Sequence, residues 1–275
     1  QYLDFGSDFS ITTPTWNHLW YIVYLLVYTL MLAPFAGRIA RFMGGTGARI
    51  TKRLFGGKWG PAAALVLPVL PHILYRITLD PYFETTHDLT WDWANHAHSL
   101  TMLMIGFLLA KDVHFWSAIR RVLPFAVGLM VGLGAGLSVI WANWEMLSEG
   151  GDWDWIIWPA RIARLAYAWI TIAALLGLAE RYLNWPSRAL TYMTEAIFPW
   201  YILHQTLTVM LGFWLTRQEL PVSIEAPLVI GGTFAGCALL HELVIRRVGF
   251  LRPLFGLKPA SASPVSRKAS AAATV

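Results

Sequence analysis

Residues 122–142 read VLPFAVGLMVGLGAGLSVIWA, an apolar run of 21 residues without a charged side chain. A helix needs about 20 such residues to cross the hydrocarbon core of a bilayer. Similar blocks recur along the chain, which is 56% hydrophobic and 13% charged, with a mean hydropathy of +0.51. A soluble domain carries roughly a quarter charged residues to supply its polar surface. The composition therefore predicts a helical protein embedded in a membrane.

The apolar blocks predict an all-α fold, a polytopic bundle of about seven transmembrane helices. We expect these spans to cover residues 18–36, 59–78, 97–111, 119–142, 157–180, 191–215 and 226–246. Glycine and proline within the blocks favour close helix packing or kinks rather than helix ends. We expect residues 1–258 to form one transmembrane domain, and the Ala/Ser/Pro-rich residues 259–275 to form a disordered cytoplasmic tail.

Charge is unequally divided between alternate loops of this bundle. One set of loops holds 17 of the 21 Lys and Arg residues, and the opposite set holds 12 of the 16 Asp and Glu residues. Because Lys and Arg concentrate on the cytoplasmic side, the first set is predicted to be cytoplasmic, with the N-terminus of the chain outside and the C-terminus inside. The net charge of +5 follows from this bias and from attraction to anionic lipid, so no nucleic-acid partner is predicted.

Ionisable side chains inside membrane spans are costly, so each is a candidate functional residue. Many of them are predicted to converge in the outer half of the bundle, which favours a polar cavity open to the outside. The candidates for substrate binding are His18, Trp20, His72, Arg76, Glu145, Arg161, Arg164, His204 and Gln205. Arg161 and Arg164 are predicted to bind a carboxylate or an oxyanion; alternatively, one of them forms a structural ion pair with Glu145.

Tryptophan is also concentrated on the predicted outer side, which holds ten of the 15 Trp residues. An aromatic belt enriches both membrane interfaces about equally, so it accounts for only part of this asymmetry. The remainder favours a surface that stacks on a ligand with apolar faces, such as a sugar ring. No metal site is predicted, because Cys237 is the single cysteine and the spacing of His96 and His98 is poor for chelation.

Three segments resemble the membrane acyltransferase 3 family. They are residues 17–22 (NHLWYI), residues 198–206 (FPWYILHQT) and residues 252–258 (RPLFGLK). The likeness extends over about residues 17–258, and it is greatest to the branch that includes glucan biosynthesis protein C.

This resemblance implies an enzyme that moves an acyl group from a cytoplasmic donor, acetyl-CoA or succinyl-CoA, to an extracytoplasmic carbohydrate such as a glucan. It also implies a multi-pass protein of the bacterial cytoplasmic (inner) membrane that needs no metal. The family has about ten transmembrane helices, and its catalytic His lies in the first. We therefore expect that His before residue 1, and we assign no catalytic residue within the chain.

The predicted polar outer cavity is also compatible with a second class of protein, a membrane transporter. A transporter or exporter of a sugar or an anionic metabolite would also place its site in a polar outer cavity. Transporters often contain internal repeats with paired broken helices, and no such repeat is evident in this sequence. The enzyme is therefore the favoured hypothesis, and the transporter is the alternative.

Overall fold

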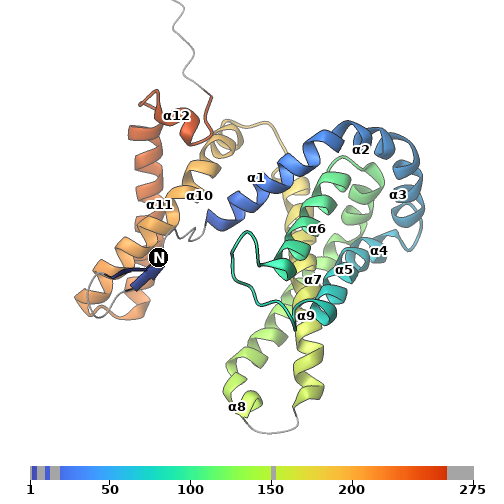
Figure 1. The fold of residues 1–275 in the computed structure, drawn as a ribbon, viewed down its shortest axis with the longest axis horizontal. Helices are drawn as coiled ribbons and strands as arrows, with labels where there is room; N and C mark the ends of the chain where they lie inside the picture. The colour runs from blue at the N-terminus through green and yellow to red at the C-terminus, as the bar shows by residue number, and fades with distance from the viewer. Residues whose placement is uncertain (1, 5–9, 13–18, 150–152, 259–275) are drawn as a thin grey trace, which may run out of the picture. The chain divides into compact units, whose positions relative to one another are not determined.

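The structure is a computed structural model, and the residues described are 2–4, 10–12, 19–149 and 153–258. The chain divides into two compact units, residues 1–185 and residues 186–275, and each is described by itself. Nearly all described residues are helical, as predicted. A short antiparallel hairpin of β1 (Tyr2–Asp4) and β2 (Ser10–Thr12), which was not predicted, precedes the first helix in the chain (Figure 1).

The first unit opens with a helical segment of 36 residues, Trp20–Phe55. Its parts are α1 (Trp20–Leu32), η2 (Ala33–Phe35), α2 (Ala36–Phe42), η3 (Met43–Gly47) and α3 (Ala48–Phe55). A straight helix of this length would be about 54 Å long, far more than a bilayer core. The segment instead bends, and α3 runs in a different direction from α1 (Figure 1).

This segment corrects one expectation, because the predicted spans 18–36 and 59–78 left residues 37–58 as the loop between them. Two helices and a π-turn cover most of these residues. The physical reason is the amphipathic pattern of α3. Thr51 and Phe55, one turn apart, are buried, whereas Arg49, Lys52 and Arg53 are exposed. A helix lets this short basic segment bury one face and leave its charges in water.

The rest of the first unit consists of helices that run back and forth. They are α4 (Gly60–Val66), η4 (Leu67–Val69), α5 (Leu70–Thr78), α6 (Trp93–Leu109), α7 (Val113–Ala142), α8 (Trp144–Glu149) and α9 (Asp154–Tyr182). The buried core lies where α7 and α9 pack against α4, and it includes Ile119, Val122 and Ala174. Trp169 Nε1 donates to the Ala64 carbonyl at 2.9 Å, which ties α9 to α4.

The direction of α6 follows from contacts at the end of the unit where α6 finishes and α4 and α7 begin. Thr51 Oγ1, before α4, donates to Asp112 Oδ2, just after α6, at 2.5 Å. Arg121, near the start of α7, donates to the Phe55 carbonyl at 2.8 Å, so α4 and α7 begin at the same end of the unit. Since α4, η4 and α5 carry the chain away from that end, α6 carries it back, alongside α5.

The second unit is built on a helical hairpin. Its elements are α10 (Arg188–Leu215), η5 (Thr216–Gln218), α11 (Val222–Leu240), η6 (His241–Ile245) and α12 (Leu251–Leu254). A Cβ on Gly232 would lie 2.9 Å from Leu211 Cδ1, so this glycine lets α10 and α11 approach closely. At the other end of the hairpin, Arg246 lies 3.2 Å from Glu195 and 3.0 Å from Glu242.

Among the described residues, six helical segments are long and apolar enough to cross a membrane. They are Trp20–Phe55, Gly60–Thr78, Val113–Ala142, Trp155–Tyr182, Arg188–Gln218 and Val222–Ile245. Each corresponds to a predicted span, so the membrane class is confirmed. The remaining predicted span, residues 97–111, forms α6, whose 17 residues extend about 26 Å, slightly less than the bilayer core. The count of seven and the orientation of the termini stay predictions.

Candidate functional site

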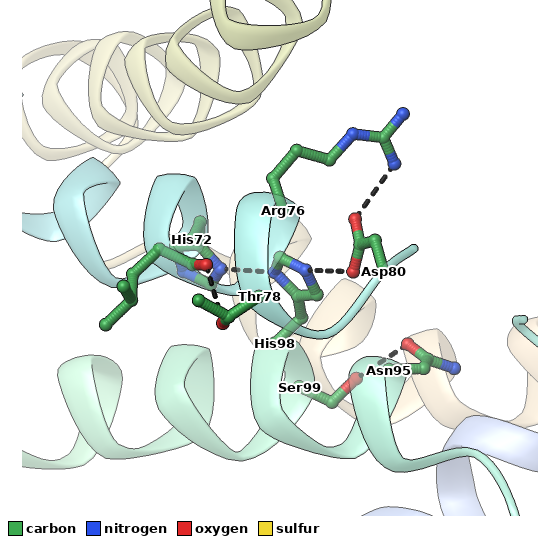
Figure 2. Close-up of polar contacts among 8 residues, drawn as sticks. His72, Arg76, Thr78, Asp80, Asn95, His98 and Ser99 are labelled. Atoms are coloured by element: carbon green, nitrogen blue, oxygen red, sulfur yellow. Dashed lines mark hydrogen bonds and ion pairs between the residues drawn. The ribbon is translucent and has the colours of Figure 1, made fainter. Parts of the chain in front are cut away.

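Four polar side chains of the first unit form one continuous chain of contacts between α5, the turn after it and α6 (Figure 2). His72 Nδ1 lies 2.7 Å from His98 Nδ1, and His98 Nε2 lies 3.2 Å from Asp80 Oδ1. The second oxygen of Asp80 accepts from Arg76 Nη1 at 2.8 Å. Two of the predicted residues, His72 and Arg76, are thus connected through two residues that were not predicted.

Helical spacing explains three of the four positions. His72, Arg76 and Asp80 follow each other at intervals of four residues, so they lie on one face of α5 and its last turn. The fourth residue, His98, comes from α6, where it packs against the Tyr75 ring at 5.4 Å. His72 is buried at 8% exposure, whereas the Arg76 side chain at the other end of the chain of contacts is 35% exposed.

For neutral imidazole rings, the hydrogen-bond pattern assigns the proton positions of His72 and His98. A carboxylate only accepts hydrogen bonds, so His98 donates its Nε2–H to Asp80. His98 Nδ1 is then an acceptor, and it receives the Nδ1–H of His72. The lone pair of His72 consequently lies on Nε2. This atom is buried, and it has no hydrogen-bond partner within the described part of the chain.

His72 and His98 both line a cavity of about 350 Å³ between α1, α5, α6 and α9, which we call the histidine cavity. Its walls are mostly apolar, with the His72 and His98 rings and the Ser99 hydroxyl among the exceptions. Its lining residues are Tyr21, His72, His98, Ser99, Met102, Leu165, Ala168 and Trp169. Nε2 of His72 is itself buried, so neighbouring atoms shield it from water.

A second cavity of the first unit, of about 710 Å³, is lined by three arginines and is called the arginine cavity here. Its volume lies within the usual range for small-molecule sites. Its polar and aromatic lining residues are Arg76, Ser138, Trp141, Trp144, Arg161, Arg164 and Tyr167. Among the described residues, Arg76 has a carboxylate at ion-pair distance, and Arg161 and Arg164 have none. The cavity therefore presents uncompensated positive charge beside aromatic rings.

His72 lines the histidine cavity, and Arg76, Arg161 and Arg164 line the arginine cavity; that these cavities open to the outside stays a prediction. The alternative ion pair between Glu145 and one of the last two arginines is not found in the described part of the chain. Glu145 is exposed on α8, one residue after Trp144. A closer neighbour of Arg161 is the Trp158 ring, 5.0 Å from the guanidinium carbon, a cation–π contact.

Of two other predicted residues, Trp20 is the first residue of α1, and His18 is outside the described residues. Trp20 stacks on the His87 ring at 4.4 Å and does not line either cavity; Tyr21, which was not predicted, lines the histidine cavity instead. Trp20 therefore helps to fix the 79–92 loop against α1 rather than to form a binding surface.

The last two predicted residues belong to the second unit. His204 Nδ1 donates to the Tyr201 carbonyl at 2.8 Å, and His204 lines a largely apolar cavity of about 400 Å³ together with Trp200 and Phe234. Gln205 is half-buried on the same helix and does not line this cavity. The predicted convergence of both residues with the outer residues of the first unit stays a prediction.

A buried carboxylate network holds the 79–92 loop next to the histidine cavity. Asp92 is fully buried and accepts from the Tyr24 hydroxyl at 2.7 Å and from Asn95 Nδ2 at 2.7 Å. It also accepts from the backbone N–H groups of Thr86 and His87, at 3.2 and 3.1 Å. These bonds connect α1, the loop and the start of α6, so they fix the position of α6 and of His98 on it.

Comparison with known families defines the class of the protein. The model of the acyltransferase 3 family, an acyltransferase domain, matches residues 2–242 and so includes all of both cavities in the first unit. The chain therefore belongs to this family of membrane acyltransferases, as its resemblance implied. No curated protein and no solved structure is significantly similar to it. The likeness to the glucan biosynthesis protein C branch stays a prediction.

Proposed function

We propose that the protein transfers an acyl group from a cytoplasmic acyl-CoA, such as acetyl-CoA or succinyl-CoA, to an extracytoplasmic carbohydrate such as a glucan. The observation that supports this most is the arginine cavity, which combines uncompensated guanidinium groups with Trp141, Trp144 and Tyr167 in a chain of an acyltransferase family. The proposed partners are the bacterial inner membrane, the acyl donor and the carbohydrate acceptor, and the reaction needs no metal ion.

The lining of this cavity suits the chemistry of O-acylation. Aromatic side chains offer a large apolar surface for the face of a sugar ring. The reaction forms a bond between a sugar hydroxyl oxygen and the acyl carbon, breaks the carbon–sulfur bond of the thioester and passes through an oxyanion. Guanidinium groups are strong donors to oxyanions and carboxylates, so Arg161 and Arg164 stabilise this charge or hold an anionic group of the substrate.

The proposed orientation of the arginine cavity in the membrane requires that α6 crosses the bilayer as a seventh span. The contacts of Thr51 and Arg121 support this, because α4 and α7 begin at one end of the unit and the chain must return between them. With α6 counted, the basic segment around α3 and the basic start of α7 lie on the cytoplasmic side. The arginine cavity, near the opposite ends of α7 and α5, then lies toward the outside, where the acceptor is expected.

Acyl transfer across sealed membrane vesicles tests this function. The protein, expressed from its native start, is supplied with radiolabelled acetyl-CoA or succinyl-CoA on the cytoplasmic face and with a glucan oligosaccharide on the other. We expect label on the glucan, in a form released by mild alkali as an ester would be. Absence of transfer from either donor, together with uptake of a sugar or an anion into the vesicles, would contradict the proposal and favour a transporter.

A further inference from the structure

We infer that the arginine cavity binds a phosphate group on the carbohydrate acceptor, so that the acceptor is a phosphorylated saccharide rather than a neutral one. The inference rests on the proposed function for the role of the carbohydrate, and it names the chemical class to which that carbohydrate belongs. The proposed ligands of the phosphate are Arg161 and Arg164 of α9, which line the cavity and lack a carboxylate partner among the described residues.

Both arginines lie well inside a candidate membrane span. Helix α9 begins at Asp154, so Arg161 is about 10 Å and Arg164 about 15 Å along its axis. A guanidinium group at such a depth is costly unless it faces a polar cavity and meets a counter-charge. The arginine cavity satisfies the first condition. A bound anion satisfies the second, because the described part of the chain offers neither side chain a carboxylate at ion-pair distance.

The balance of charge around the cavity favours a phosphate over a carboxylate. Three guanidinium groups line the cavity, and that of Arg76 is already paired with Asp80 at 2.8 Å, so those of Arg161 and Arg164 remain. A carboxylate brings one negative charge, whereas a phosphate monoester brings close to two at neutral pH and offers three acceptor oxygens. Two guanidinium groups can share one phosphate, which matches it in both charge and donors.

Packing restrains the two arginines on one face of α9. They are three residues apart, and Tyr167 follows on the same face. The Trp158 ring lies 5.0 Å from the guanidinium carbon of Arg161, a contact that restrains the side chain without neutralising its charge. A Cβ on Gly134 of α7 would lie 3.3 Å from the Tyr167 ring, so α7 approaches this ring closely and holds it in the lining. The guanidinium groups are therefore partly oriented before a ligand binds.

The aromatic lining indicates that the phosphate is attached to a sugar. Trp141 of α7 and Trp144 of α8 line the same cavity as the arginines, and their rings offer apolar surface to the face of a sugar ring. Coenzyme A is the other source of phosphate in the proposed reaction. The donor is expected in the cytoplasm, however, and the cavity is proposed to lie toward the outside. The inference therefore commits to a phosphate of the acceptor.

The ionisable groups around the cavity allow a pH test that reports on the ligand. The ionisable side chains at or beside the lining are Arg76, Asp80, Glu145, Arg161, Arg164 and Tyr167, with His98 in contact with Asp80. Of these residue types, only histidine ordinarily titrates between pH 5 and 8. A phosphate monoester loses its second proton near pH 6. A pH dependence of binding that persists in His98→Gln therefore belongs to the ligand.

The test measures the binding of two charged sugars to the detergent-purified protein, expressed from its native start, without an acyl donor. The probes are glucose 6-phosphate and glucose 6-sulfate, with glucose as the neutral reference, and microscale thermophoresis gives each Kd. We expect glucose 6-phosphate to bind about tenfold more tightly at pH 7.5 than at pH 5, because only about a tenth of it is dianionic at pH 5. Glucose 6-sulfate keeps a single charge, so it should bind equally at both pH values and more weakly than the phosphate at pH 7.5.

Substitutions assign this binding to the arginines. The double variant Arg161→Gln, Arg164→Gln should weaken the binding of glucose 6-phosphate at least about 100-fold and remove its pH dependence. Arg164→Lys keeps the charge but not the planar fork, so it should bind more weakly and keep the pH dependence. The matched control is Arg120→Gln, because Arg120 is exposed and already paired with Glu180. It should bind the phosphate probe as the wild-type protein does.

Competition with coenzyme A distinguishes the two sources of phosphate. Coenzyme A should not displace glucose 6-phosphate from the protein. Displacement that the double variant Arg161→Gln, Arg164→Gln abolishes would assign the arginines to the donor and overturn the inference. Binding of the phosphate probe no tighter than that of glucose 6-sulfate or glucose at pH 7.5 would overturn it as well.

The outcomes separate this inference from the proposed function, because the binding measurement involves no acyl transfer. If the protein transfers acyl groups to a glucan but binds the phosphate, sulfate and neutral probes alike, the inference is wrong and the function stands. If the phosphate probe binds as expected but no acyl group is transferred, the proposed function fails while the phosphate site stands.

Discussion

His72 and Arg76 lie one turn apart on α5 but line two different cavities, and Asp80 and His98 connect them. One end of this connection is a buried, mostly apolar space, and the other is a larger space with two arginines that lack carboxylate partners among the described residues. The contacts of Asp80 and His98 therefore connect the linings of the two cavities along one helix face.

Asp92→Asn should destabilise the protein although Asp92 is outside both cavities. The substitution replaces a buried acceptor of four hydrogen bonds with an amide that offers one acceptor oxygen and places an N–H₂ group among donors. We expect a loss of about 1–3 kcal/mol in the free energy of unfolding, measured by thermal melting in detergent. Asp88→Asn, at an exposed position of the same loop, should change it little. Equal melting temperatures for both variants would contradict the buried network.

Gly60→Ala should prevent the junction of α3 and α4 from forming correctly. A Cβ at this position would lie 1.9 Å from the Phe55 carbonyl oxygen, which is backbone and also the acceptor of the Arg121 hydrogen bond. Nothing lies within 4 Å of a Cβ on Gly57, three residues earlier, so Gly57→Ala is the matched control. We expect low yield and aggregation on size-exclusion chromatography for Gly60→Ala only. A monodisperse Gly60→Ala protein would show that this close approach is absent.

The two ends of α6 should be accessible from opposite sides of the membrane. Single cysteines at Glu84 and Lys111, both exposed, report these ends once Cys237 is replaced by Ala. An impermeant maleimide added outside intact cells should label the cysteine at position 84 and leave the one at position 111 unlabelled until the cells are permeabilised. Labelling of both from outside would make α6 a re-entrant segment and reduce the spans to six.

Much of the architecture could be predicted because each membrane span is a long run of consecutive apolar residues, which is visible in the sequence alone. Bilayer thickness sets the length of an apolar block, so each of the six candidate segments contains or overlaps a predicted span. Residues 37–58 were misread because their charge and glycine content suggested a loop, whereas the helix there depends on Phe55 packing into the core and on Thr51 being buried against Asp112. Such packing is a tertiary effect that local composition does not reveal.

The candidate site was only half predictable for a similar reason. The spacing of His72 and Arg76 indicated a shared helix face, and the cost of charge in a membrane marked Arg161 and Arg164. His98 and Asp80 carried no comparable signal. His98 is 26 residues from His72, and only the return of α6 alongside α5 brings the two rings together. In the sequence, Asp80 looks like an ordinary acidic residue of a loop. Only the structure shows that it continues the face of α5 that carries His72 and Arg76.

The most direct test of the central claim, that the arginine cavity serves acyl transfer to a carbohydrate, is kcat/KM for the glucan acceptor in the double variant Arg161→Gln, Arg164→Gln. Each guanidinium that bonds to charge contributes about 1.5–3 kcal/mol, so the double variant should lose at least about 100-fold. Arg120→Gln, at an exposed ion pair with Glu180, should keep the wild-type value. A folded double variant with unchanged kcat/KM would contradict the account.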